Sequence, residues 1–434
     1  MPRGRTLLVV IAVLAWAAVA AWNALKPLPP GTHVASLSTR LTESQVQIVA
    51  VSAAGSARAA GGDIEARELA AIDRASELIV LDAAPLSRAV GRGLLLQRTK
   101  RPNIKIVLVS DPRSEAYGGT PVEYLESLER AGVIVARVRL DRLRDCIPLY
   151  SALWRLTVGW WSDPFDEHPA EPGLRALLRE RNRKADQRRL LVADDGAGGW
   201  VSFLSAAPDG DLAVQITGDL ARDIAASEIK IAAWSSGDDR LPVPPRTAAG
   251  GPGSIDARFL TEGAIRGAML DALGTAAAGD EVGLAAPRLS DRRVIGALLR
   301  AAARGAQVRV LLDPGATPNS SVAAELERGG SGNIELRWRE RPALATAAFA
   351  FVARRGELWA STGAADFTRP SLDDVDLESA IELRLPERAA AARALESHFA
   401  AKWAAGAAYP RHAVESQAGY WQYRLMAAAQ LAAY

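Results

Sequence analysis

The sequence has little cysteine, histidine and lysine, and each shortage excludes a class of site. Cys146 is the only cysteine among 434 residues, which excludes an intramolecular disulfide and a multi-cysteine metal site. The four histidines, His33, His168, His398 and His412, lack the short spacing of zinc ligands. We therefore expect no metal site and no cofactor.

An excess of charge of one sign is also missing. The chain has 52 basic and 50 acidic residues, which gives a net charge of +2 at pH 7. The two signs are interspersed, so no strong field builds up and a nucleic-acid partner is not expected. The apolar content of 49% over this length is sufficient for two packed domains of ordinary size.

One long apolar run is present at the N-terminus, from Leu7 to Leu25, and Arg3 and Arg5 precede it. A helix of this length measures about 28 Å, close to the ~30 Å hydrocarbon core of a bilayer. We expect a single membrane anchor over residues 1–26, with the arginines in the cytoplasm and the main body outside it, in the periplasm. A cleaved signal peptide is the alternative, because residues 18–20 form a small-residue cleavage site.

Apolar runs alternate with helical patterns from residue 33 to residue 240. Strands are predicted at 78–81, 104–109 and 133–138, with helices over 86–97 and around 124–128. This rhythm is typical of an α/β lobe with a mixed or parallel sheet flanked by helices. The aromatic-rich stretch 149–161 is interpreted as a helix packed on the sheet, and a lipid-facing patch is the alternative.

A linker rich in proline and glycine, residues 241–254, separates this lobe from a second one over residues 255–407. Strands are predicted at 280–286 and 308–314, and a last helix ends at Gly406. Residues 408–434 form a C-terminal tail segment. The fold class expected is therefore α/β, with two lobes after an N-terminal transmembrane helix.

Three segments of the second lobe resemble the phospholipase D superfamily. They are residues 259–314, the loop 363–369, which looks like the family's Gly-Ser-x-Asn-Phe-Thr loop, and residues 373–378, which look like its Asn-Leu-Glu strand. The first lobe is similar in the loop that starts at Asp111-Pro112 and in the run 141–155. The resemblance implies two similar lobes that face each other across one cleft.

Active members of that family carry one His-x-Lys-x4-Asp motif in each lobe. A histidine attacks phosphorus, the lysines hold the phosphate oxygens, and the second histidine protonates the leaving oxygen. In the first lobe Gln187 and Arg189 stand where histidine and lysine belong, and only Asp194 is kept. Residues 346–350 of the second lobe have lost all three motif residues. Because an amide is not a nucleophile, the resemblance implies a chain without the family's hydrolase chemistry.

Recognition of an anion is the property that the motif region could retain. Arg188 and Arg189 offer guanidinium groups for a phosphate or carboxylate, and a solvated basic face is the alternative. Asp366, Thr368 and Glu378 occupy the family's polar loop positions and are further candidate ligand-binding residues. Hydrogen bonding within turns and at strand ends is the structural alternative for these three.

The sequence thus predicts a membrane-anchored, phospholipase D-like protein of the cell envelope that is catalytically inactive. It would bind a phosphorylated or lipid ligand, or a protein partner. An active phosphodiesterase or phosphatidyl transferase with atypical catalytic residues is one alternative. An envelope scaffold, in which both lobes serve only as a stable surface, is the other.

Overall fold

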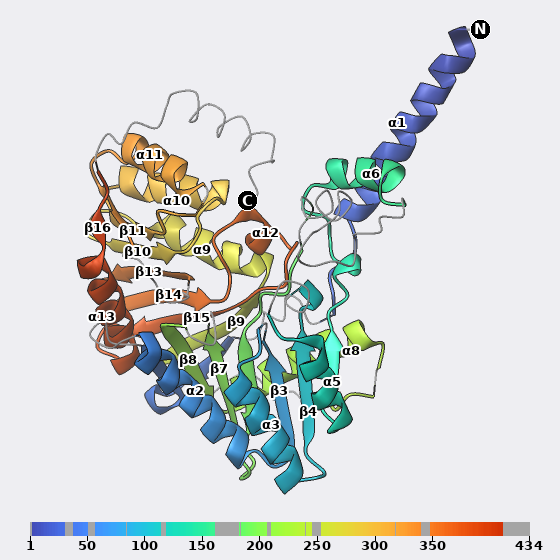
Figure 1. The fold of residues 1–434 in the computed structure, drawn as a ribbon. Coiled ribbons are helices and arrows are strands. Elements are labelled where there is room, and N and C mark those ends of the chain that lie inside the picture. Colours follow the sequence, from blue (N-terminus) through green and yellow to red (C-terminus); the bar gives the residue numbers. More distant parts are fainter. Residues whose placement is uncertain are drawn as a thin grey trace.

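The computed structural model of the protein describes residues 2–30, 38–50, 57–83, 85–113, 119–160, 182, 184–205, 210–238, 240–244, 253–316, 318–339 and 348–410. His33, His168 and His412, the centre of the predicted linker and nearly all of the predicted tail lie outside these residues. Two α/β lobes pack against each other, and the N-terminal helix α1 (Pro2–Ala24) projects away from them (Figure 1). The two-lobe α/β fold predicted from the sequence is therefore confirmed.

The first lobe is built on a seven-stranded mixed sheet in the order β2-β8-β7-β6-β3-β4-β5. Strands β3, β4 and β5 are parallel, and the remaining pairs are antiparallel. The strands are β2 (Val46–Ala50), β3 (Leu78–Asp82), β4 (Lys105–Ser110), β5 (Ile134–Arg137), β6 (Leu190–Asp194), β7 (Trp200–Ser205) and β8 (Leu212–Thr217). The helices are α2 (Ala57–Arg74), α3 (Arg88–Lys100), α5 (Val122–Arg130), α6 (Pro148–Thr157) and α8 (Asp219–Ser236), and the short 3-10 helices are η2 (Glu43–Gln45) and η3 (Leu140–Arg142).

The second lobe is built on a nine-stranded sheet in the order β1-β9-β15-β14-β13-β10-β11-β12-β16. The strands are β1 (Ser38–Leu41), β9 (Ile255–Thr261), β10 (Glu281–Ala286), β11 (Gln307–Leu312), β12 (Ile334–Trp338), β13 (Ala348–Arg354), β14 (Glu357–Gly363), β15 (Ser379–Pro386) and β16 (Ala407–Ala408). The helices are α9 (Gly263–Thr275), α10 (Arg292–Ala303), α11 (Asn319–Gly329), α12 (Arg369–Leu372) and α13 (Ala390–Ala405).

The two lobes share one hydrophobic core. Side chains alternate between the faces of each strand, so Val80 of β3 faces the shared core while Ile79 faces the helices of its own lobe. Helix α8 contributes Ile224 to the shared core, and helix α13 contributes Phe399. Because both sheets bury a face against these two helices, the lobes form a single packed body.

The first strand of the chain belongs to the sheet of the second lobe. The sequence predicts residues 38–41 in the first lobe, but β1 pairs antiparallel with β9, with Ser38 opposite Arg258 and Leu41 opposite Ile255. Without β1, the outer edge of β9 would expose unpaired backbone groups. The sheet of the first lobe therefore starts at β2, and the chain crosses between the lobes before that strand.

Helix α6 does not pack on the sheet, and the interpretation of residues 149–161 as a sheet-covering helix is wrong. Helix α6 packs on α1, at the base of the projecting helix (Figure 1). Within α1, residues Thr6–Ala24 form the one helical stretch of the described chain that is long and apolar enough to cross a membrane. An N-terminal apolar helix suited to anchor the protein is thus present.

Candidate functional site

The motif strands of the two lobes correspond through their sheet registers. Ala193 of β6 lies opposite the second residue of β3, and Val352 of β13 lies opposite the second residue of β10. Counting back along both strands places Arg189 at the position of Ala348. The position equivalent to Gln187 is residue 346, which lies outside the described residues. The described part of the second motif therefore offers no cation at the lysine position.

Asp194 is the one residue of the family motif that this sequence retains. It lies at the end of β6 opposite to Arg189 and binds the backbone of residues 76–78 there. Its carboxylate accepts backbone N–H groups from Ser76 at 2.9 Å and from Glu77 and Leu78 at 2.8 Å. Burial acts to raise the pKa of Asp194, but these hydrogen bonds outweigh it and lower the pKa. The geometry gives Asp194 a structural role at the start of β3.

Gln187 lies in a segment that joins the first lobe to the second. The Gln187 N–H donates to the Leu377 carbonyl at 2.9 Å, and the Leu377 N–H donates to the Ala185 carbonyl at 3.0 Å. The amide side chain of Gln187 donates to the Asp376 carboxylate at 3.4 Å. The residue at the nucleophile position therefore contributes a contact between the lobes.

Arg188 is fully buried at the same junction. Its guanidinium contacts Glu228 of α8 at 2.9 Å and Glu262, directly after β9, at 2.6 Å. Burial acts to lower the pKa of Arg188, but the two carboxylates outweigh it and raise the pKa above its ordinary value. The interpretation of this residue as part of a solvated basic face is wrong, and its donors already face protein carboxylates.

Buried carboxyl groups surround this arginine. Burial is the largest factor that raises the pKa of Asp82, Asp186, Glu228 and Glu378. Neither oxygen of the Asp82 carboxyl has a hydrogen-bond partner among the described residues. After burial, the carboxyl groups of Asp186 and Glu228 contribute to the rise in the pKa of Asp82, which favours its neutral form.

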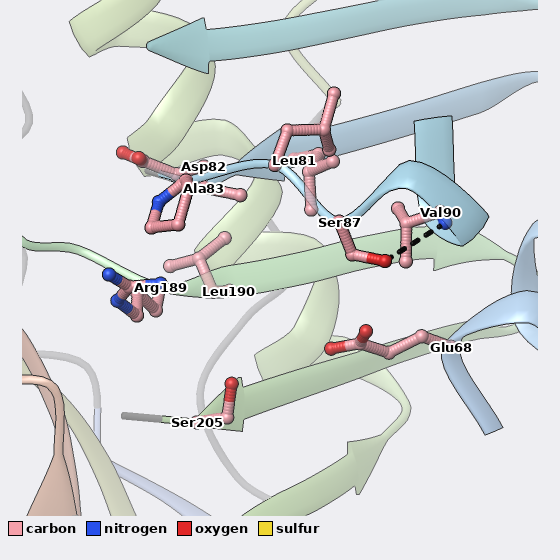
Figure 2. A pocket seen from close by; sticks show the side chains of 11 residues that line it. Glu68, Leu81, Asp82, Ala83, Ser87, Val90, Arg189, Leu190 and Ser205 are labelled. Carbon is pink, nitrogen blue, oxygen red and sulfur yellow. Dashed lines mark hydrogen bonds between the residues drawn. The ribbon is translucent and has the colours of Figure 1, made fainter. Parts of the chain in front are cut away.

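Arg189 lies beside an open hollow in the first lobe. The enclosed part of the hollow has a volume of only about 30 Å³, and the figure rises to about 340 Å³ when the open space at its mouth is included. Figure 2 shows Asp82 and Arg189 at one end, Glu68 at the other, and Ser205 between them. Burial, followed by the neighbouring Glu65, raises the pKa of Glu68 to about 7. The remaining lining residues are Leu81, Ala83, Pro85, Leu86, Ser87, Val90 and Leu190.

The chemistry of the hollow suits an oxyanion. Arg189 supplies a permanent cation whose planar guanidinium matches phosphate and carboxylate oxygens. Burial raises the pKa of Asp82 well above its ordinary value and the pKa of Glu68 to about 7, which favours the neutral form of both carboxyl groups. Sequence reasoning missed Glu68 and Asp82, because an isolated acidic residue at the end of a strand or within a helix carries no motif.

The second-lobe candidates lie outside the lining of this hollow. Asp366 accepts a hydrogen bond from Arg288 at 3.0 Å, and Thr368 shares one with Ser371 at 3.1 Å. Glu378 is fully buried, and its backbone N–H donates to Glu262 at 3.1 Å. None of these three residues is among those that line the hollow. No cluster of metal-ligating side chains occurs among the described residues.

Comparisons with known proteins agree with this architecture. Residues 270–403 match the family described as cardiolipin synthase, PLD-like domain. No curated protein matches the chain. Phosphatidylserine synthase of Haemophilus influenzae has a similar structure, with a TM-score of 0.58 at 10% identity over 95% of this chain and 97% of that one.

Two further solved structures match with lower scores. Polyphosphate kinase of Porphyromonas gingivalis has a TM-score of 0.48 at 13% identity, over 89% of this chain and 53% of that one. The phospholipase D family member Nuc of Salmonella typhimurium has a TM-score of 0.30 at 16% identity, over 36% of this chain and 99% of that one. The two-lobe architecture, the matched family segment and the full-length similarity in structure together identify a phospholipase D superfamily fold.

Proposed function

We propose that the protein is a membrane-anchored, phospholipase D-like protein that lacks the family's hydrolase chemistry and binds a phosphoryl-bearing ligand. The observation that carries the proposal is the place of Arg189 in the lining of the open hollow. The other motif residues, Gln187, Arg188 and Asp194, make contacts that hold the protein together. The motif region keeps a cation for an oxyanion but no group that attacks phosphorus.

The absence of a nucleophile supports the inactive state. An amide at position 187 forms no covalent phosphoryl intermediate, and loss of a catalytic nucleophile lowers rates by roughly 10⁴ to 10⁶. An active enzyme with atypical residues is the second candidate. The pKa of Glu68, raised to about 7, favours this candidate, because a general acid or base works best near the operating pH.

A lipid-type ligand is supported by the apolar N-terminal helix. The N-terminal helix α1 is suited to anchor the body at a membrane, and Arg3 and Arg5 favour a body outside the cytoplasm. The structural neighbour from Haemophilus influenzae is named as a phosphatidylserine synthase. A phospholipid headgroup and a free phosphorylated molecule share the chemistry that Arg189 recognises, so the test must distinguish them.

The full-length protein in a phosphate-free detergent is the material for the test. Inorganic phosphate, glycerol 3-phosphate and short-chain phosphatidic acid are titrated by calorimetry, and hydrolysis of bis-p-nitrophenyl phosphate and phospholipid is followed in parallel. We expect binding without turnover, and a loss of about tenfold in affinity in Arg189→Ala, comparable to one charge-assisted hydrogen bond. Arg189→Lys keeps the charge, and Arg240→Ala removes an exposed arginine as the matched control.

The outcomes separate the candidates. Tighter binding of phosphatidic acid than of glycerol 3-phosphate identifies a lipid ligand, and equal affinities identify the phosphoryl group alone. Turnover that disappears in a Gln187→Ala, Arg189→Ala double variant would establish an enzyme. Equal affinity in the wild type and Arg189→Ala, or no binding at all, would support the scaffold.

A further inference from the structure

Helix α6 exposes its apolar face, whereas a helix on the surface of a soluble protein buries that face. Leu149, Leu153, Leu156 and Trp160 recur at helical spacing and are 56%, 54%, 44% and 72% exposed. The opposite face is buried and carries small residues, Ser151 at 1% and Ala152 at 0% exposure. A helix in water normally buries its apolar face. The outward apolar stripe therefore indicates an apolar environment around α6.

The buried side of α6 is held by ionic contacts. Arg155 contacts the Asp145 carboxylate at 3.1 Å, and Lys184 contacts the same carboxylate at 2.6 Å. Asp145 itself has no exposed side-chain surface. These contacts fix which face of the helix points outward, so the leucine stripe cannot turn inward without breaking a buried ion pair.

The stripe continues the apolar surface of α1. The two helices pack together, and the Trp16 indole N–H donates to the Leu149 carbonyl at 2.8 Å. The end of α1 is tied to the same part of the body, because the Asp145 N–H donates to the Asn23 carbonyl at 3.1 Å and Lys26 donates to the Asp141 carbonyl at 2.7 Å. Helix α6 is therefore fixed at the level of Trp16 on the anchor.

The length of α1 decides where the bilayer surface lies. From Thr6 to Trp16 the helix rises only about 15 Å, half of the ~30 Å hydrocarbon core. The whole stretch Thr6–Ala24 rises about 28 Å and spans the core. If α6 were in water, the part of α1 beyond it would be too short to cross. A spanning α1 thus requires α6 to lie within the same apolar layer.

We propose that α6 is a second membrane-embedded element, which lies in the outer leaflet with its leucine stripe against lipid. Helices of this kind enter the boundary between headgroups and acyl chains by roughly 5–10 Å. Trp160 and Trp22, 72% and 73% exposed, then lie where aromatic side chains favour the interface. This inference rests on the membrane anchor of the proposed function, and it adds a second contact that fixes the orientation of the body relative to the bilayer.

The test measures the depth of single positions in the full-length protein. An environment-sensitive fluorophore is attached to Leu153→Cys, to Val10→Cys in the anchor and to Leu96→Cys, an exposed leucine of α3. The wild type is the labelling blank, because Cys146 is buried. The proteins are reconstituted into phosphatidylethanolamine and phosphatidylglycerol vesicles with brominated acyl chains, at several protein-to-lipid ratios.

We expect the label at position 153 to be quenched by shallow bromine at least threefold more than the label at position 96, and the label at position 10 to be quenched by deep bromine. Quenching at position 10 without quenching at position 153 would overturn the inference and leave the anchor intact. Absence of quenching at both positions would contradict the membrane anchor as well as the inference. The label at position 153 could instead report an apolar environment that bromine does not quench and that becomes stronger at higher protein-to-lipid ratios. This result would show that a second copy of the protein covers the stripe, and it would contradict the inference.

Discussion

Arg188 of the first lobe and Glu262 of the second lobe are in contact at 2.6 Å, and both side chains are almost completely shielded from solvent. In active members of the phospholipase D superfamily, the first motif supplies groups that act on substrate. Here the same segment fastens the two lobes together, and Glu228 completes the arrangement at 2.9 Å. The segment at the first motif position therefore has a structural role in this chain.

Replacement of Arg188 by methionine should destabilise the protein severely. Removal of the cation leaves Glu228 and Glu262 buried without it, and loss of one partner of a buried ion pair costs about 3–5 kcal/mol. The measurement is the free energy of unfolding in urea, in detergent. Arg40→Met removes an exposed ion pair with Asp256 and should change this free energy by about 1 kcal/mol at most.

A triple variant tests whether uncompensated charge causes the loss. Arg188→Met with Glu228→Gln and Glu262→Gln removes the cation and both carboxylates together, so it should recover a large part of the stability. A triple variant as unstable as Arg188→Met alone would refute the electrostatic explanation and point to packing.

Asp194→Ala should destabilise the first lobe without any effect on phosphate binding. The change leaves three backbone N–H groups of residues 76–78 without their acceptor, at about 1–3 kcal/mol for each group that stays buried. Asp194→Asn keeps one acceptor oxygen and should be intermediate. Because folding lowers the pKa of Asp194, its contribution is present above the ordinary value of 3.8 and is lost as the pH falls below it.

Calorimetric titration of Asp194→Asn with inorganic phosphate checks the second half of this prediction. An affinity equal to that of the wild type is expected, because Asp194 lies at the end of β6 remote from Arg189. A lower affinity for phosphate in a fully folded Asp194→Asn protein would show that Asp194 contributes to phosphate binding.

Glu68 should make the protein less stable as the pH rises from 4.5 to 7. Folding raises the pKa of this carboxyl from 4.5 to about 7, so the folded protein binds more protons across that range. Its stabilising contribution is complete below 4.5 and is lost as the pH passes 7. One pKa unit corresponds to ~1.4 kcal/mol, so we expect an effect on the order of 2 kcal/mol for this partly exposed side chain.

The pH dependence of unfolding in Glu68→Gln isolates this contribution. The difference between wild type and variant should grow steadily across the range and then level off. A constant difference would show that Glu68 has the same proton affinity in the folded and unfolded protein.

Gly283→Ala should cost about 1–3 kcal/mol by overpacking the second sheet. Gly283 lies opposite Phe351 on the neighbouring strand, and an added Cβ would stand 1.9 Å from the phenyl ring. The smaller side chain of Phe351→Leu should restore part of the stability in the Gly283→Ala background. Gly267→Ala is the matched control, because nothing lies within 4 Å of its added Cβ. It should stabilise α9 by about 0.5–1 kcal/mol.

The buried strands were predictable because their sequences are continuous apolar runs. The sequence predicts strands at 78–81 and 280–286, and the structure has β3 at Leu78–Asp82 and β10 at Glu281–Ala286. The crossing of β1 was not predictable, because Ser38–Leu41 is short and only Leu41 is buried. Its place depends on the free edge of β9, which lies more than 200 residues later in the chain.

The candidate site was less accessible to sequence reasoning than the fold. A run of basic residues resembles a solvated face, and the partners that bury Arg188 lie 40 and 74 residues away. The orientation of α6 was missed for a related reason. Its aromatic content fits either a sheet or lipid, and only the ion pair of Arg155 with Asp145 determines which face points outward.

Because β1 joins the sheet of the second lobe, it can pair only late during synthesis of the chain. The strand leaves the ribosome next to the anchor, but its partner β9 follows only after the whole first lobe. Strand β1 therefore remains without its partner while about half of the protein is made. A separately expressed second lobe would lack this strand and would present β9 as an open edge, prone to join with other chains.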